Sequence, residues 1–154
     1  MARRIYVASS WRNPRHPAVV AALREAGHEV FDYRNPAPGK AGFAWTQITP
    51  AERPWPAEQL RDVLEHPIAV ESFDLDHGGM AWADAVVMVL PCGKSAHLEL
   101  GWCAGAGKLA IVLMEQADEP ELMYREIYAT GGRICATVDE VVAALAEPAG
   151  EAVG

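Results

Sequence analysis

The chain has 154 residues, of which 51% are hydrophobic and 22% charged, with a formal net charge of -8 and a pI near 5.0. These values are typical of one globular domain with its own core, expected over residues 1–147 and followed by a flexible tail at 148–154. The acidic charge argues against a nucleic-acid partner, and no apolar run approaches the roughly 18 residues of a membrane span.

Strand-like and helix-like segments alternate along the chain. Apolar runs that favour β-structure predict strands at residues 5–9, 29–33, 85–90, 109–114 and 133–137. Helical spacing of apolar residues, with glycine at several ends, predicts helices at residues 16–26, 56–64, 67–82, 95–106, 119–129 and 138–146. The segment 34–56 is rich in proline, glycine and aromatic residues, and such long irregular loops are often functional.

This alternation predicts an α/β fold with a parallel sheet and helices on both faces. With right-handed crossovers, five strands favour a flavodoxin-like (Rossmann-like) three-layer sandwich with strand order 2-1-3-4-5. The switch point then lies between the first and third strands. The turns at Ser9-Ser10-Trp11 and at residues 91–95 are expected to face each other across one crevice, where such folds bind ligands.

The second of these turns leads from a buried strand into a helix that carries Glu99 in its first turns. Apolar residues flank Glu99 on a helix that must pack on the sheet, so we expect a half-buried acid, which is a functional candidate. Backbone N–H groups after Gly93, together with Lys94 and Ser95, could hold a phosphate or a ribose. The alternative is that Ser95 only caps the helix and Lys94 is a solvated side chain.

Two motifs in this region fail on spacing. Gly93-Lys94-Ser95 resembles the end of a P-loop, but that pattern needs a glycine where Met88 stands. His97-Leu98-Glu99 resembles a zinc-deaminase motif, but the order of the blocks is reversed and the second cysteine is missing. We therefore expect no metal and no cofactor. Three cysteines without zinc-type spacing suggest a reducing, cytoplasmic compartment.

The chain carries five tryptophans, which is many for its length. Trp11 and Trp45 lie in predicted loops at the active edge, where a flat side chain suits stacking on a nucleobase. Packing that anchors these loops is the alternative for each of them. Trp82 and Trp102 are expected in the core.

Several blocks follow one another in a recognisable order. They are Ile5-Tyr6-Val7-Ala8 in the first strand, then Asp76 with Met80 and Ala83-Asp84, then Ser95-Ala-His-Leu-Glu-Leu-Gly101, and finally Gly107-Lys108. Together they resemble the nucleoside 2-deoxyribosyltransferase superfamily over roughly residues 4–146. This superfamily includes base-exchanging transferases and hydrolases that cut the N-glycosidic bond of (deoxy)nucleotides.

The resemblance implies an enzyme that cleaves or transfers at the N-glycosidic bond of a (deoxy)nucleoside or a nucleoside 5′-monophosphate. It implies that Glu99 is the nucleophile, that Asp76 contacts or protonates the leaving base, and that Tyr6 orients Glu99. Gly93 stands where transferases of the family often carry an aspartate that handles the base, and Lys94 favours a substrate with a 5′-phosphate. Because a neighbouring subunit often completes the site in this family, a homodimer or larger homo-oligomer is implied.

Two alternatives remain open. The same scaffold could be a non-catalytic nucleotide-binding or sensing module, because a fold does not fix a function. It could also be an NAD-cleaving domain of the Toll/interleukin-receptor type, which uses a glutamate in an α/β sheet. The choice of base, sugar and acceptor is expected to depend on the loop at 34–56.

Overall fold

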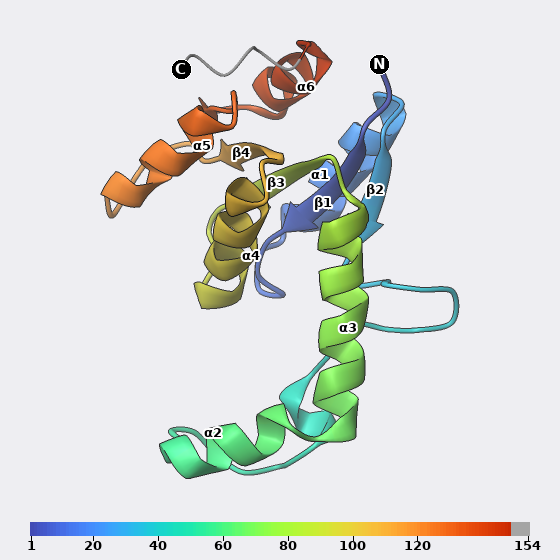
Figure 1. Ribbon diagram of the computed structural model, residues 1–154, viewed down its shortest axis with the longest axis vertical. Coiled ribbons are helices and arrows are strands. Elements are labelled where there is room, and N and C mark those ends of the chain that lie inside the picture. The colour runs from blue at the N-terminus through green and yellow to red at the C-terminus, as the bar shows by residue number, and fades with distance from the viewer. Residues whose placement is uncertain (149–154) are drawn as a thin grey trace.

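The computed structural model describes residues 1–148 and shows a parallel sheet between helices, in the upper half of the view in Figure 1. The sheet order is β2-β1-β3-β4-β5, and every pairing is parallel, which confirms the predicted flavodoxin-like architecture. The strands are β1 (Arg4–Ala8), β2 (Glu29–Asp32), β3 (Ala85–Val89), β4 (Leu109–Leu113) and β5 (Ile134–Cys135).

The helices follow the strands in the predicted order, with one correction. The predicted helix at 119–129 is wrong in its first half, because the Glu121 side chain accepts a hydrogen bond from the Met123 amide at 2.9 Å and starts only a short turn. The elements are α1 (His16–Glu25), η1 (Trp45–Gln47), α2 (Ala57–Leu64), α3 (Pro67–Trp82), α4 (Lys94–Gly105), η2 (Leu122–Tyr124), α5 (Arg125–Ala129) and α6 (Val138–Ala146).

Two apolar clusters hold the three layers together. Alternate strand positions point to opposite faces of the sheet, and helices α1 and α6 cover one face while α3, α4 and α5 cover the other. All five residues of β3 are buried, as the uninterrupted apolar run predicts. Across residues 1–148, no helix combines the length and apolarity that crossing a membrane requires. The predicted tail at 148–154 lies, apart from Pro148, outside the described residues.

Helix α3 approaches the sheet closely because it carries Gly79. A Cβ atom at that position would lie 2.7 Å from the ring of Phe31, which is far inside van der Waals contact. Phe31 in turn stacks on Tyr6 of β1, with 5.3 Å between the ring centroids. At the end of α3, the ammonium group of Lys108 donates to the carbonyls of Ala81 and Ala83. These contacts fix the half of α3 that lies beside the sheet.

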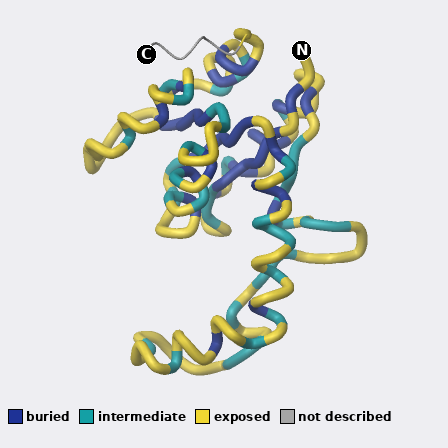
Figure 2. Tube along the Cα trace, in the orientation of Figure 1, coloured by how far each residue is buried: buried dark blue, intermediate teal, exposed yellow. Residues whose placement is uncertain are grey.

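The other half of α3 leaves the sheet and carries α2 at its far end (Figure 1). We call η1, α2 and the first half of α3 the arm, residues 43–75. Its surface is mostly exposed (Figure 2). Four large apolar side chains of the arm are 43 to 61% exposed, namely Leu60, Leu64, Val70 and Phe73. The arm therefore presents apolar surface that this chain alone does not cover.

Candidate functional site

Three side chains from separate elements meet on the sheet face between α3 and α4. Tyr6 comes from the middle of β1, Asp76 from α3 and Glu99 from the second turn of α4. They lie close enough that the charge of Asp76 raises the pKa of Glu99 while the Tyr6 hydroxyl lowers it. The three residues singled out as catalytic from the sequence are thus brought together by the fold.

The environment of these groups moves both carboxyl pKa values toward neutrality. Burial raises the pKa of Glu99 to about 7, and the neighbouring charge of Asp76 adds to the effect. Burial raises the pKa of Asp76 to about 6. Two interacting carboxyls of this kind titrate as a pair, so around pH 6 to 7 they share about one proton. The site then offers one ionised and one protonated carboxyl.

The hydroxyl of Tyr6 is the polar group that distinguishes Glu99 from Asp76. Tyr6 is fully buried, and within residues 1–148 its oxygen has no partner that meets full hydrogen-bond geometry. An unpaired buried hydroxyl costs about 1–3 kcal/mol, so donation to the ionised Glu99 carboxylate removes that cost. Burial and the Glu99 charge raise the pKa of Tyr6, which keeps the phenol protonated and able to donate. Donation by Tyr6 therefore stabilises the form of the pair in which Glu99 carries the negative charge, although the pKa of Asp76 stays the lower of the two and Asp76 ionises first.

Two thiols border the same space. Burial raises the pKa values of Cys92 and Cys103 to about 11, and the charge of Glu99 contributes to both. At neutral pH these side chains are thiols, and a thiol is a poor nucleophile. These weakly polar side chains lie near Glu99 and contribute to its burial. Within the described residues, no three His, Cys, Asp or Glu side chains are grouped as a metal site would need.

The turn after β1 is fastened to the end of β3, so the two predicted turns do lie together. The Ser9 hydroxyl donates to the carbonyl of Val89 at 2.8 Å, and the Asn13 amide donates to Ser9 at 3.0 Å and to Val89 at 3.2 Å. Ser10 accepts from the Arg12 amide at 3.1 Å. The Ser9 hydroxyl is therefore already engaged in holding the turn. Asn13 was missed from the sequence, although asparagine beside proline is a recognised turn signal.

The turn before Glu99 opens to solvent. Gly93 is the N-cap of α4, and Lys94 and Ser95 are exposed in the first turn, without a side-chain cap. The reading of Ser95 as the helix cap is therefore wrong. A Cβ at Gly93 would meet nothing within 4 Å, which leaves space in front of the exposed N–H groups of the helix.

His97 connects this turn to η2, which follows β4. One ring nitrogen lies 2.8 Å from the carbonyl of Gly93, and the other lies 2.8 Å from the hydroxyl of Tyr124. The two rings also stack, with 5.8 Å between centroids. Neither role was found from the sequence, because nothing local to His97 indicates a partner 27 residues away.

The tryptophans separate into different environments. Trp11 is 51% exposed in the turn after β1, at the expected edge. Trp45 packs on Phe43 and Trp55, at centroid distances of 4.8 and 5.4 Å, and its helix η1 belongs to the arm rather than to the sheet edge (Figure 1). The prediction that Trp45 lies at the active edge is therefore wrong within one chain, because residues 43–56 belong to the arm. Trp102 is 40% exposed, so its predicted core position is also wrong.

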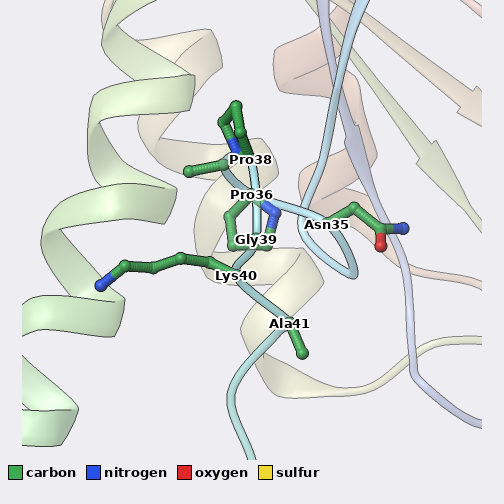
Figure 3. Close-up of a pocket in the computed structure, with 7 residues that line it drawn as sticks. Asn35, Pro36, Pro38, Gly39, Lys40 and Ala41 are labelled. Carbon is green, nitrogen blue, oxygen red and sulfur yellow. The ribbon is translucent and has the colours of Figure 1, made fainter.

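The loop at 35–41 forms a hollow of its own beside α3 (Figure 3). Ala37 and Lys40 form an antiparallel bridge, and Lys40 pairs with Glu71 of α3, toward which its side chain extends in Figure 3. None of the three candidate catalytic residues lines this hollow. The loop is fixed to the arm, and the candidate site is defined by the side chains around Glu99.

Comparison with solved structures shows that this chain has a known fold. No family model matches the chain, and neither does any curated protein sequence. A solved 2-deoxyribosyltransferase from Bacillus psychrosaccharolyticus aligns at 21% identity, over 92% of this chain and 90% of that one, with a TM-score of 0.55. A solved CMP N-glycosidase from Clostridium botulinum aligns at 17% identity, over 92% and 96%, with a TM-score of 0.52. At these identities, the comparison shows that the fold is shared.

Proposed function

We propose that the chain belongs to the nucleoside 2-deoxyribosyltransferase superfamily and cleaves or transfers at the N-glycosidic bond of a nucleoside or nucleoside 5′-monophosphate. The observation that carries this proposal is the meeting of Glu99, Asp76 and Tyr6 on one sheet face, with about one proton shared by the two carboxyls near neutrality. Support comes from the fold, which is shared with a 2-deoxyribosyltransferase and a CMP N-glycosidase over 92% of the chain.

The first step uses the form of the singly protonated pair in which Glu99 is ionised and Asp76 is protonated, which a proton transfer from Glu99 to Asp76 supplies. A Glu99 oxygen attacks the anomeric carbon, the bond from that carbon to the base nitrogen breaks, and its electron pair leaves with the base. The base takes the proton of Asp76. Positive charge builds on the sugar in the transition state, and a desolvated carboxylate beneath it stabilises that charge. Donation by Tyr6 lowers the pKa of Glu99 and so favours its ionised form before attack.

The second step returns the site to its starting state. Water attacks the anomeric carbon of the glycosyl ester, the carbon–oxygen bond to Glu99 breaks, and the water proton passes to Asp76. An incoming base can replace water, in which case its own nitrogen attacks and its proton is lost to Asp76. The identity of this acceptor decides between a hydrolase and a transferase.

The first turn of α4 supports the proposal of a 5′-phosphate on the substrate. Lys94 and Ser95 are exposed there beside the N–H groups of the helix, and the space in front of Gly93 is open. A helix N-terminus and a lysine both favour an anion. We therefore propose a nucleoside 5′-monophosphate as the preferred substrate, bound with its phosphate at residues 93–95 and with its base against the turn of Ser10 and Trp11.

A second copy of the chain is the proposed partner of the arm. Leu60 and Leu64 are one turn apart on α2, and Val70 and Phe73 are three residues apart on α3, so each pair shares a helix face. An apolar surface of this kind is typical of a protein interface. Sedimentation velocity should show a homodimer or larger assembly that Phe73→Glu dissociates, and a monomeric wild-type protein would refute the partner proposal.

A chromatographic screen for released base tests the reaction. Purified protein is incubated with ribo- and deoxyribonucleosides, their 5′-monophosphates and NAD, each with and without a second free base. Glu99→Gln is the inactive variant, and Glu126→Gln on the exposed side of α5 is the matched control.

The outcomes of this screen are distinct. Base release from a monophosphate that is lost only in Glu99→Gln supports a nucleotide hydrolase, and exchange that requires added base supports a transferase. If NAD is the only compound that is cleaved, with release of nicotinamide, the result favours the NAD-cleaving alternative. A thermal shift by one nucleotide without release from any compound favours the binding module and overturns the proposal.

A further inference from the structure

Arg34 follows β2, and its guanidinium contacts the turn that follows β1. One terminal nitrogen lies 3.1 Å from the carbonyl oxygen of Ser10, 3.2 Å from that of Trp11 and 3.0 Å from that of Asn13. Three carbonyls thus converge on one cation from a segment 21 to 24 residues away. Because a guanidinium stays charged in proteins, these hydrogen bonds are charge-assisted.

The same guanidinium supports the ring of Trp11. Its central carbon lies 5.2 Å from the centroid of that ring, within the range of a cation–π contact. Tyr33 meets Trp11 edge-on at 5.6 Å. A Cβ at Gly42 would lie 2.3 Å from Trp11 Cζ2, so the backbone of residue 42 also lies against the ring. Trp11 is thus held by groups from the segment after β2, yet it remains 51% exposed.

The held turn borders the candidate site. Ser9 and Asn13 both donate to the carbonyl of Val89, the last residue of β3, which leads into the helix that carries Glu99. A shift of this turn therefore changes where Trp11 stands relative to the Glu99 helix. An exposed aromatic ring held this firmly is suited to stacking on a flat group, and such stacking on one base is typically worth roughly ten- to hundredfold in affinity.

We infer that Arg34 is a positioning residue that fixes Trp11 as a rigid wall for the base of the substrate. This inference rests on the proposed function, because it names the group that Trp11 contacts. Arg34 acts through Trp11 and the carbonyls of its turn, so it determines how tightly the base is held and leaves the chemistry at Glu99 unchanged.

The first test needs no substrate. The emission of Trp11 is obtained as the difference between proteins with and without Trp11→Phe, in the wild-type and in the Arg34→Lys background. Lysine keeps the charge but lacks the planar fork, so we expect the acrylamide quenching constant of Trp11 to rise at least twofold and its anisotropy to fall. Arg24→Lys is the matched control, because Arg24 donates to the single carbonyl of Val30 on the exposed surface. Unchanged quenching and anisotropy would overturn the inference.

The second test separates binding from chemistry with CMP and AMP. For whichever of the two is cleaved, Arg34→Lys should raise KM about tenfold and leave kcat within twofold, and in a Trp11→Ala background it should raise KM less than twofold. A loss in kcat at constant KM, or an equal rise in KM in both backgrounds, contradicts the inference. If the wild-type protein cleaves neither nucleotide, the proposed function is in doubt, while the emission of Trp11 still decides the role of Arg34.

Discussion

Replacement of Glu99 by glutamine should abolish turnover and make the folded protein more stable at neutral and alkaline pH. The wild-type carboxyl has to be ionised in a buried site, beside the charge of Asp76. Glutamine has nearly the same shape and can still accept a hydrogen bond from Tyr6, but it carries no charge. A residue that serves chemistry at the expense of stability is expected to behave in this way.

The magnitude follows from the pKa of Glu99, which is raised from 4.5 to about 7. Because the folded protein holds this proton more tightly than the unfolded chain, Glu99 favours folding most at low pH, and this contribution is lost as pH rises through 7. At about 1.4 kcal/mol per pH unit, the raised pKa of Glu99 costs the folded state about 3 kcal/mol at pH 8, where Glu99 is ionised, and about 1 kcal/mol at pH 5, where folding requires Glu99 to be protonated. For a chain of this size, about 3 kcal/mol corresponds to a Tm difference of roughly 6–12 °C.

Thermal and urea unfolding at pH 5 and pH 8 check this prediction, with base release measured on the same samples. Glu99→Gln should be more stable than the wild type at both values, with a gain about three times larger at pH 8. Glu126→Gln, at an exposed position, should have the same stability and the same turnover as the wild type at both pH values. A glutamine variant that is less stable than the wild type at pH 8, or a gain that does not depend on pH, would refute the reasoning.

Three further predictions concern the same site. The pH profile of kcat/KM should be bell-shaped with its maximum between about pH 6 and 7, where the carboxyl pair holds one proton, and a plateau extending to pH 9 would contradict this. Tyr6→Phe should move the alkaline limb of that profile up by about one pH unit, because the hydroxyl that it removes lowers the pKa of Glu99, the higher of the two; an unmoved limb would separate Tyr6 from the chemistry. Gly79→Ala should cost about 1–3 kcal/mol in urea unfolding, because its Cβ meets the ring of Phe31, whereas Gly78→Ala, with open space around it, should be neutral or stabilising by up to about 1 kcal/mol. Equal effects of the two alanines would show that α3 does not depend on close approach to the sheet.

Local pattern was sufficient to predict the sheet and the helix that carries Glu99, whereas Tyr6 and Asp76 were named as its partners only by the family resemblance. The apolar run of β3 and the glycine turn after it indicate a buried strand that feeds a helix, and parallel topology then brings the ends of β1 and β3 together. Gly79 shows the limit of propensity. It weakens a helix locally, yet α3 continues through it because the missing side chain lets the helix pack against Phe31.

Contacts between distant segments could not be predicted in this way. Arg34, Asn13 and His97 act through partners 21 to 76 residues away, and nothing in their immediate sequence names those partners. The course of the segment that carries Trp45 could not be predicted either, because an aromatic, proline-rich loop can pack on the sheet or extend from it with similar local conformations. Its position along the arm is set by tertiary packing among Phe43, Trp45 and Trp55.

The most direct test of the central claim is mass spectrometry of the protein quenched in acid during turnover of a nucleoside monophosphate that it cleaves. We expect a fraction of the protein to gain the mass of the sugar phosphate, with the ester mapped to the peptide that contains Glu99 and absent from Glu99→Gln. An adduct on another residue, or turnover by Glu99→Gln close to the wild-type rate, would contradict the assignment of Glu99 as the nucleophile.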